Sequence, residues 1–515
     1  MDTIKKPVML MILDGWGINP ETDGNAVAQA RTPNLDQLKQ TCPVTRLKCS
    51  GKAVGLPPGI MGNSEVGHLN LGAGRIVYQD LLRIDMAVED GSFEDNPMFQ
   101  GVMNKVKAGN TALHLMGLVS DGGVHSQLDH LLALIDMAGK RGVEKIYVHA
   151  ILDGRDTPPD SGIRYMKTLT DHIAKKGHGK IATVCGRFYA MDRDTRWERT
   201  HQAYELYTLG QGAYFADPLM AVQHAYDHGE TDEFVKPVAI TTAEGSPMAT
   251  IQDNDGVIFF NFRSDRARQI TRALTSQTFE FFERKVVPTL TDYVCMTSYD
   301  ETFTLPVAFQ PVSMTGILGE VVSQKGLRQL RIAETEKYAH VTYFFNGGEE
   351  KPFPLEDRCL IPSPRDVATY DLKPEMSAVA VCEEVITRLR SNIYDLVVLN
   401  FANMDMVGHT GVMAAAIQAC ETVDKCVGDI VAEIRALGGT LLVTADHGNS
   451  EKMVDEKGEP FTAHTLHDVP LVLVDDSRKN AHLKEGKLGD IAPTILHLMG
   501  IQPSPEMTGN CLISE

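Results

Sequence analysis

The sequence predicts an α/β protein of two domains, and three observations lead to this prediction. The chain has 515 residues, whereas a single hydrophobic core rarely serves more than about 250–300 residues. Short apolar runs alternate with helical patterns, which is typical of parallel sheets covered by helices on both faces. Charged residues follow directly after these runs, at the positions where open α/β sheets bind ligands.

The predicted strands are continuous apolar runs rich in β-branched residues. They are Val8–Leu13, Ile146–Leu152, Ile181–Val184, Gly256–Phe262, Asp395–Phe401, Thr440–Thr444 and Pro470–Val474. Polar residues that could form a site come just after six of them, namely Asp14, then Asp153, Arg155 and Asp156, then Arg187, then Arg263 and Arg266, then Asp405, and finally Asp446. A single such residue is typical of a solvated loop, but the repetition indicates functional sites at the carboxyl ends of the strands.

The residue types also divide the chain. Carboxylates and histidines suited to metal lie towards both ends, whereas arginines concentrate between about 155 and 266. We therefore predict a metal-binding domain that is split in sequence, residues 1–77 and 311–515, with an anion-binding domain inserted at residues 78–310.

Composition excludes several classes of partner. The net charge of −19 disfavours nucleic acid and anionic membrane surfaces, so we expect a small-molecule substrate. The apolar runs are far shorter than the roughly 20 residues that span a bilayer. The nine cysteines form no Cys-x-x-Cys pair, which favours reduced thiols in a cytoplasmic protein.

A mixed set of carboxylates and imidazoles predicts a metal centre. Asp405 and His409 are four residues apart and share one face if the segment is helical. Asp446 and His447 follow a predicted strand, and His464 lies in a loop-like segment. Together with Asp14, this set without cysteine suits Mn²⁺ or Zn²⁺, and its oxygen content favours Mn²⁺.

Ser64 stands where a glycine-flanked loop enters a predicted helix. A serine there is often a helix N-cap. It is equally well placed as a nucleophile towards phosphate, because the backbone N–H groups and the helix dipole stabilise an incoming anion. The position alone leaves both interpretations open.

Several longer motifs resemble a known family. Asp14-Gly15-Trp16-Gly17, Gly62-Asn63-Ser64-Glu65-Val66-Gly67-His68 and Asp446-His447-Gly448-Asn449 resemble the alkaline-phosphatase-like superfamily. Ser120–Ser126, Asp153–Pro159, Gly186–Asp194, Asn261–Arg266 and Glu336–Thr342 narrow the resemblance to the 2,3-bisphosphoglycerate-independent phosphoglycerate mutases. The resemblance extends over nearly the whole chain.

This resemblance implies an isomerase of glycolysis and gluconeogenesis that interconverts 3-phosphoglycerate and 2-phosphoglycerate through a phosphoserine on Ser64. It implies two Mn²⁺ ions per chain, with Zn²⁺ or Co²⁺ as alternatives, and a monomeric protein. One ion would be held by Asp14, Ser64, Asp446 and His447, and the other by Asp405, His409 and His464. Substrate would be bound by His125, Arg155, Asp156, Arg187, Arg193, Arg263, Arg266 and Lys337.

Three alternatives remain at this point. A phosphohydrolase or a phosphopentomutase of the same superfamily would share the metal centre, but the inserted arginine-rich segment favours capture of a small acid. A phosphometabolite-binding protein without catalysis would be expected to lack part of the nucleophile and ligand set, and every member is present.

Overall fold

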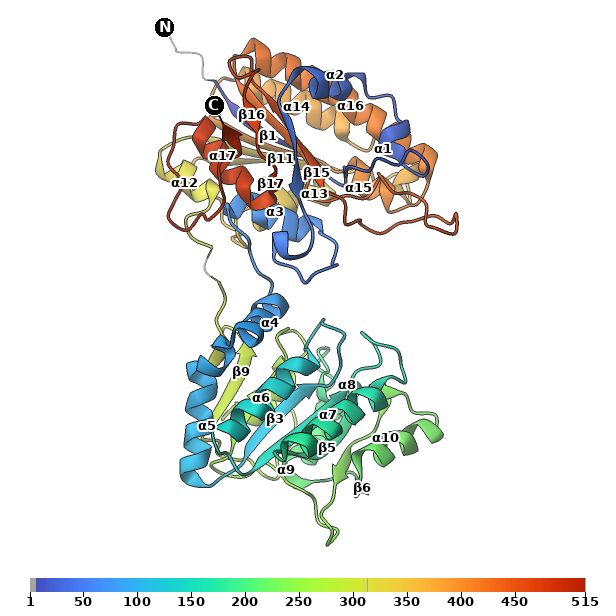
Figure 1. The fold of residues 1–515 in the computed structure, drawn as a ribbon, viewed down its shortest axis with the longest axis vertical. Helices are drawn as coiled ribbons and strands as arrows, with labels where there is room; N and C mark the ends of the chain where they lie inside the picture. The colour runs from blue at the N-terminus through green and yellow to red at the C-terminus, as the bar shows by residue number, and fades with distance from the viewer. Residues whose placement is uncertain (1–5, 313, 515) are drawn as a thin grey trace. The chain divides into compact units, whose positions relative to one another are not determined.

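The computed structural model describes residues 6–312 and 314–514, which form two compact α/β units. Unit 1 comprises Met1–Gln79 and Ser313–Glu515, and unit 2 comprises Asp80–Val312. Figure 1 shows helices on both faces of the sheet in each unit. The predicted α/β class is therefore confirmed.

Unit 1 is built on an eight-stranded sheet with β1 near its centre. In spatial order the strands are β12 (Glu356–Ile361), β11 (Gln329–Glu334), β13 (Leu396–Phe401), β1 (Val8–Leu13), β14 (Thr440–Thr444), β15 (Val469–Val474), β2 (Val44–Lys48) and β17 (Gly486–Lys487). A separate two-stranded sheet pairs β16 (His482–Leu483) with β18 (Ile513–Ser514). Every residue of β1 is buried, as expected for a strand covered on both faces.

The helices of unit 1 form two groups, one on each face of its sheet (Figure 1). One group contains α1 (Ala26–Gln29), α2 (Pro33–Thr41), α14 (Ala378–Arg390), α15 (Asn403–Gly408) and α16 (Met413–Ala436). The other contains α3 (Ser64–Ala73), α12 (Leu318–Gln324) and α17 (Ile491–Leu498). The short α13 (Thr335–Ala339) continues directly into a π-helical turn, His340–Phe344.

Unit 2 also has an eight-stranded sheet. In spatial order its strands are β10 (Val307–Phe309), β9 (Asp292–Thr297), β8 (Gly256–Phe259), β3 (Leu113–Leu118), β4 (Ile146–Leu152), β5 (Lys180–Gly186), β7 (Val238–Ile240) and β6 (Ala213–Phe215). Its helices are α4 (Asp80–Asp90), α5 (Pro97–Gly109), α6 (Leu128–Lys140), α7 (Gly162–Lys176), α8 (Arg187–Ala190), α9 (Trp197–Leu209), α10 (Pro218–Asp227) and α11 (Arg268–Thr275).

The sheet of unit 2 has a hydrophobic core on each face. Along β4, Val148, Ala150 and Leu152 belong to one core, whereas Ile151 belongs to the other. Successive side chains of a strand point to opposite faces, so a strand between two cores is expected to be mainly apolar. The exception in β4 is the buried His149, which contacts His114 and Thr183 at 2.9 Å. This explains why β4 was predictable from its mainly apolar sequence.

One predicted strand differs in direction from the expectation of parallel sheets. β15 pairs in antiparallel fashion with both β14 and β2. Its predecessor in the chain is β14, and the described residues 445–468 between them contain no helix. Parallel neighbours need a crossover connection, usually a helix, and without one the chain returns antiparallel.

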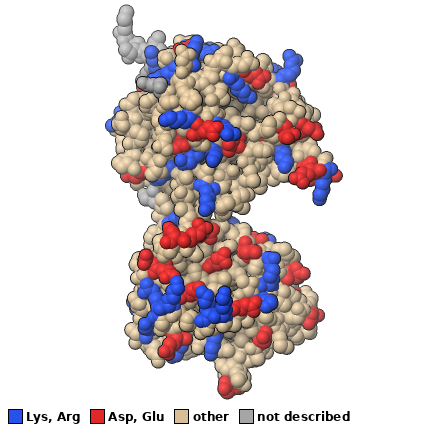
Figure 2. Space-filling model, in the orientation of Figure 1, with Lys and Arg blue, Asp and Glu red and all other residues tan. Residues whose placement is uncertain are grey.

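No helix among the described residues is long and apolar enough to cross a bilayer. On the face shown in Figure 2, basic and acidic side chains are interspersed over the surface of each unit.

Candidate active site

The carboxyl ends of three neighbouring strands bring three aspartates to one edge of the sheet in unit 1. β1 pairs in parallel with both β13 and β14. Asp14 follows β1, Asp405 lies in α15 just after β13, and Asp446 comes shortly after β14. All three side chains are buried. Three carboxylates held this close away from water require positive charge nearby.

Ser64 is the first residue of α3, and its side chain is buried beside these carboxylates. The N-cap interpretation is wrong for Ser64, because Asn63 occupies that position and caps the helix with its side chain. The Ser64 hydroxyl donates to Asp14 Oδ1 at 3.2 Å, and its Oγ lies 3.0 Å from His447 Nε2. Lys337 Nζ donates to Ser64 Oγ at 2.7 Å.

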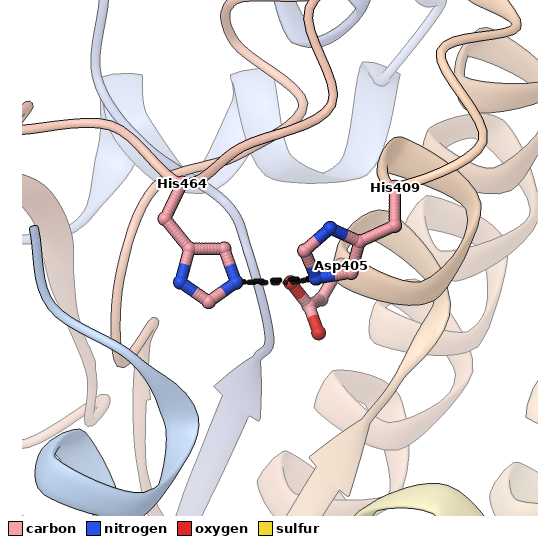
Figure 3. Close-up of side chains that lie close together, drawn as sticks. All are labelled: Asp405, His409 and His464. Carbon is pink, nitrogen blue, oxygen red and sulfur yellow. Dashed lines mark hydrogen bonds and ion pairs between the residues drawn. The ribbon is translucent and has the colours of Figure 1, made fainter. Parts of the chain in front are cut away.

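Asp405, His409 and His464 form a compact group at the mouth of the site (Figure 3). Asp405 Oδ1 lies 3.2 Å from His409 Nε2 and 3.1 Å from His464 Nε2. His409 Nδ1 lies 2.7 Å from the carbonyl oxygen of Thr462, and His464 Nδ1 lies 2.9 Å from that of Gly62. Donation from Nδ1 leaves the Nε2 lone pairs converging on one point, which is how metal-binding histidines are usually oriented.

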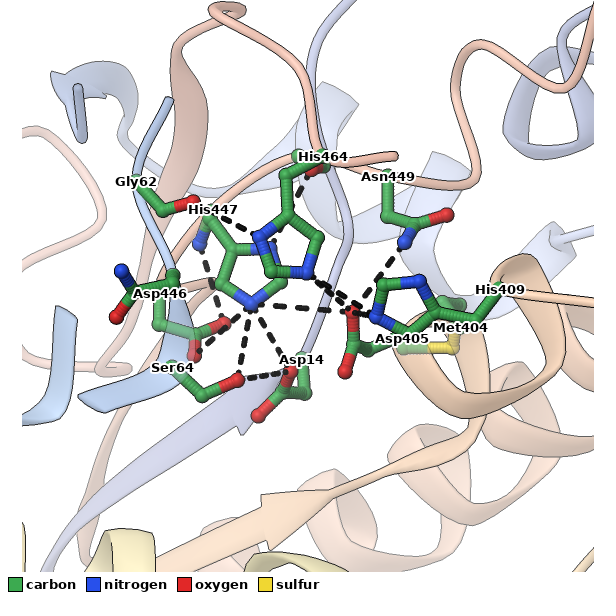
Figure 4. A network of polar contacts seen from close by, with 12 residues as sticks. Asp14, Gly62, Ser64, Met404, Asp405, His409, Asp446, His447, Asn449 and His464 are labelled. Atoms are coloured by element: carbon green, nitrogen blue, oxygen red, sulfur yellow. Dashed lines mark hydrogen bonds and ion pairs between the residues drawn. The ribbon is translucent and has the colours of Figure 1, made fainter. Parts of the chain in front are cut away.

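A second group lies deeper, around His447 (Figure 4). His447 Nε2 is 3.4 Å from Asp14 Oδ1 and 3.9 Å from Asp405 Oδ1. Asp446 Oδ2 is buried and makes no hydrogen bond, although His68 Nδ1 lies 3.2 Å away. A buried carboxylate oxygen without a donor is costly unless a cation satisfies it.

Lys337 lies among the buried carboxylates. Its Nζ is 2.8 Å from Asp14 Oδ1 and 2.6 Å from Asp405 Oδ2. Burial lowers its pKa, but Asp14, Asp405 and Asp446 outweigh burial and leave the pKa above its ordinary value. Burial likewise lowers the pKa of His447, and Asp446, Asp14 and Asp405 raise it to about 10. The negative charge of the buried aspartates therefore favours protonated side chains or bound cations in this centre.

Two residues that the sequence analysis did not single out hold the carboxylates in place. Asn400 Nδ2 donates to Asp14 Oδ2 at 2.7 Å and contacts His68 Nε2 at 3.0 Å. His68 Nε2 is then an acceptor, so its Nδ1 carries the proton and faces the Ser64 carbonyl at 2.9 Å. The sequence signal for Asn400 was a polar residue in the otherwise apolar strand β13, and His68 ends the motif Gly62–His68.

Arg187 anchors a group of charged residues in unit 2. Its side chain is only 2% exposed, and Nη1 donates to Asp153 Oδ1 at 2.7 Å and to Asp156 Oδ2 at 2.6 Å. Its Nε has no partner. His125 lies 3.8 Å from Asp156 and 3.7 Å from Asp265. Burial, with the nearby Arg187, lowers the pKa of His125 to about 4.

The other predicted arginines are close to this group. Arg193 pairs with Asp265 at 2.7 Å, and Arg263 pairs with the same carboxylate at 3.2 Å. Burial lowers the pKa of Arg266, and the charges of Arg187, Arg193 and Arg155 lower it further. Arginines that repel one another in an acidic protein form a natural binding site for an anion.

The predicted site residues therefore gather in two places. Unit 1 brings together Ser64, Lys337 and the predicted metal ligands Asp14, Asp405, His409, Asp446, His447 and His464. Unit 2 brings together His125, Arg155, Asp156, Arg187, Arg193, Arg263 and Arg266. Lys337, predicted among the substrate-binding residues, shares its site with the metal ligands.

Comparison with known proteins extends this picture. A family model described as the BPG-independent PGAM N-terminus matches residues 84–301. The chain is 56% identical over 510 residues to the 2,3-bisphosphoglycerate-independent phosphoglycerate mutase of Syntrophotalea carbinolica, with 99% of each chain covered. It is 56% identical over 515 residues to 2,3-bisphosphoglycerate-independent phosphoglycerate mutase 1 of Methanosarcina barkeri, covering 100% of this chain and 99% of that relative.

A solved structure agrees with the fold. The phosphoglycerate mutase of Leishmania mexicana, crystallised at low cobalt concentration, matches with a TM-score of 0.61 and 33% identity. The match covers 100% of this chain and 98% of that one. An identity of 56% to these two relatives, sustained along the whole chain, shows that this protein belongs to the family of 2,3-bisphosphoglycerate-independent phosphoglycerate mutases.

Proposed function

We propose that this chain is an isomerase that interconverts 3-phosphoglycerate and 2-phosphoglycerate in glycolysis and gluconeogenesis, without bisphosphoglycerate, through a phosphoserine on Ser64. The observation that carries the proposal is the environment of the Ser64 hydroxyl. Ser64 is the first residue of helix α3, and its Oγ lies within 3.2 Å of polar atoms of Lys337, Asp14 and His447. The names of the relatives support the same reaction.

The donor atoms of unit 1 fit two divalent cations. Asp14, Ser64, Asp446 and His447 would hold one ion, and Asp405, His409 and His464 would hold the other. The buried Asp446 Oδ2 without a donor and the convergent Nε2 atoms of His409 and His464 support this assignment. When bound, divalent ions lower the pKa of a hydroxyl and neutralise phosphoryl oxygens.

Mn²⁺ is our proposal for both ions, with Zn²⁺ or Co²⁺ as alternatives. The ligands are carboxylate oxygens, a hydroxyl and imidazoles, with no thiolate among them. Hard oxygen donors suit Mn²⁺, whereas sites rich in thiolate select softer ions.

The proposed reaction has two transfers. Ser64 Oγ attacks phosphorus, an Oγ–P bond forms, and the bond from phosphorus to the 3-oxygen of glycerate breaks. Glycerate then turns, its 2-hydroxyl attacks the phosphoserine, and Ser64 is released. The Lys337 ammonium, which donates to Ser64 Oγ, neutralises charge on the transferring group in both steps.

The arginine group of unit 2 would bind the glycerate carboxylate and the phosphate through their planar guanidinium groups. His125 and Asp156 are our candidates for moving protons between the attacking and departing hydroxyls. His125 is neutral near pH 7 because its pKa lies at about 4, so it can accept a proton.

The test is ³¹P NMR of 3-phosphoglycerate with the enzyme and Mn²⁺, and with no bisphosphoglycerate added. We expect 2-phosphoglycerate to accumulate to equilibrium. Release of inorganic phosphate would instead identify a phosphohydrolase, and phosphate transfer on ribose phosphates only would identify a phosphopentomutase. Labelled glycerate in the reaction should stay out of 2-phosphoglycerate, since transfer within one enzyme-bound glycerate excludes exchange.

We also propose that the protein is a cytoplasmic monomer that acts on small molecules rather than on nucleic acid or membranes. Free thiols at all nine cysteines, which lie among the described residues, support a reducing compartment. The net charge of −19 disfavours polyanionic partners.

A further inference from the structure

Glu451 is a fully buried carboxylate beside the candidate metal centre. Its Oε2 accepts hydrogen bonds from the backbone N–H groups of Gly17 at 3.1 Å and Asn449 at 2.8 Å. Its Oε1 accepts a hydrogen bond from the Thr465 hydroxyl and contacts His467 Nδ1 at 3.0 Å. Both oxygens are therefore satisfied by donors from three separate segments of the chain.

Each of these segments carries a proposed metal ligand close to the donor. Gly17 follows Asp14, Asn449 follows His447, and Thr465 follows His464 directly. A fourth ligand is reached through the Asn449 side chain, whose Nδ2 donates to Asp405 Oδ1 at 3.3 Å. One carboxylate thus connects the segments that supply ligands to both proposed ions.

The local sequence accommodates the Glu451 carboxylate closely. A Cβ atom at either Gly17 or Gly448 would collide with this group. Burial raises the pKa of Glu451, but hydrogen bonds from His467 and Thr465 outweigh burial and hold the pKa below its ordinary value. The side chain is therefore ionised, and an ionised carboxylate accepts stronger hydrogen bonds than a neutral group.

We infer that Glu451 is a positioning residue that aligns the ligand-bearing segments of the metal centre without contacting an ion itself. This inference rests on the proposed function, because it takes the metal ligands from there. Residues that orient metal ligands from behind typically change metal affinity about 10- to 100-fold when they are replaced.

Backbone hydrogen bonds also join these segments, so loss of Glu451 should leave the fold intact. The Gly15 carbonyl accepts from Asn449 N at 3.0 Å and from Ser450 N at 3.1 Å. Thr465 N donates to the Gly448 carbonyl at 3.0 Å. Glu451 adds the side-chain connections that set the relative orientation of the loops.

The chemistry of the four donors predicts different effects for two substitutions. Glu451→Ala removes all four contacts. Glu451→Gln can keep them, since its carbonyl can face the two N–H groups while its amide faces Thr465 and His467. The Thr465 hydroxyl can rotate to accept, and His467 can change tautomer, whereas a backbone N–H cannot become an acceptor.

The experiment measures equilibrium Mn²⁺ binding to the metal-free full-length enzyme, by calorimetry and by the EPR signal of free Mn²⁺. We expect Glu451→Ala to bind Mn²⁺ at least about tenfold more weakly than wild type, and Glu451→Gln to bind close to wild type. The matched control is Asp424→Ala. Asp424 is equally buried in unit 1 and accepts from the backbone N–H groups of Asn34 and Leu35, but touches no ligand-bearing segment.

Mn²⁺ affinity in Glu451→Ala equal to that of the Asp424→Ala control would overturn the role of Glu451. A Gln variant as weak as the Ala variant would also contradict it, because retained geometry should rescue binding. Thr465→Val, which loses only one hydroxyl, provides a milder test if Glu451→Ala does not fold. It should weaken Mn²⁺ binding, and unchanged affinity would count against the inference. Wild type that binds no Mn²⁺ would overturn the metal centre itself, a result distinct from failure of Glu451 alone.

Discussion

Lys337 Nζ lies 2.7 Å from Ser64 Oγ, so a buried ammonium donates directly to the proposed nucleophile. This contact has two consequences. It directs one lone pair of the serine oxygen towards the lysine, and it places positive charge where a phosphoryl group would arrive.

Ser64→Ala should abolish mutase activity and leave the fold intact, because only a nucleophilic oxygen can carry the phosphoryl group. Wild type quenched during turnover should show phosphate on Ser64 by mass spectrometry, and the variant should show none. Circular dichroism of the variant provides the control for folding. Substantial turnover by the alanine variant would rule out the phosphoserine route.

Arg266→Ala should weaken substrate handling without loss of metal. The guanidinium is partly buried and donates to the Met191 carbonyl at 3.0 Å, and it faces the other arginines of unit 2. Losing a buried charge that binds an ionic partner typically costs about 2–5 kcal/mol, so kcat/KM should fall at least about 30-fold.

The measurements are steady-state kinetics and metal content by mass spectrometry, with Arg272→Ala as the control. Arg272 lies on α11 and pairs with Asp300 at 3.3 Å, outside the arginine group. Arg263→Ala should resemble Arg266→Ala. If the variants lost metal but kept wild-type kinetics, these arginines would serve the metal centre and not the substrate.

Mn²⁺ uptake by the metal-free enzyme should release protons at pH 7. The pKa of His447 is about 10 in the absence of metal, since the three aspartates outweigh the effect of burial. A histidine ligand must be neutral, so binding expels its proton. The sign follows: raising the pH towards 10 removes the competing proton and strengthens Mn²⁺ binding, and lowering the pH weakens it.

The apparent affinity should rise about tenfold per pH unit for each proton displaced, which corresponds to about 1.4 kcal/mol. Calorimetry in buffers of different ionisation enthalpy counts the released protons. His447→Gln, which cannot be protonated in this range, should release fewer. Affinity that is the same at pH 6 and pH 8 would show that His447 is not linked to metal binding.

Glu334→Gln should change the pH dependence of stability. Glu334 ends β11 and accepts from Ser363 Oγ at 2.8 Å, while its Oε1 has no partner. Burial raises its pKa from 4.5 to about 7, so the native state holds a proton that the unfolded state loses. The stability from this group is present below pH 4.5 and is lost as pH rises towards 7.

Between pH 5 and pH 8 the variant should gain up to about 3 kcal/mol over wild type in free energy of unfolding, because a neutral amide escapes this loss. Urea unfolding monitored by circular dichroism at both pH values measures the difference. Parallel pH dependence of the two proteins would show that Glu334 is not the titrating group.

Parts of the fold were predictable from local patterns. Ile146–Leu152 was predicted with the bounds that the structure has for β4, because a strand between two cores is mainly apolar. β3 and β11 were missed. The apolar pattern of β3 is broken twice, by His114 and Gly117, whereas β4 carries only His149, which contacts His114 at 2.9 Å. In β11 the buried Arg331 donates to Gln329 at 2.7 Å. Such residues look exposed until their partners are known.

For the site, the sequence by itself determined the residue types and their places after strands, as for Asp14 and Asp446, because strand ends can be recognised from the chain alone. Longer motifs added the family. Only the tertiary structure decided that Lys337 contacts Ser64, that β15 returns antiparallel, and that Glu451 collects donors from three segments. A hydrogen bond depends on atoms a few ångströms apart, and Gly17 and Glu451 are 434 residues apart in the chain. A local sequence pattern therefore cannot predict this contact, which forms only when the sheet brings the strand ends together.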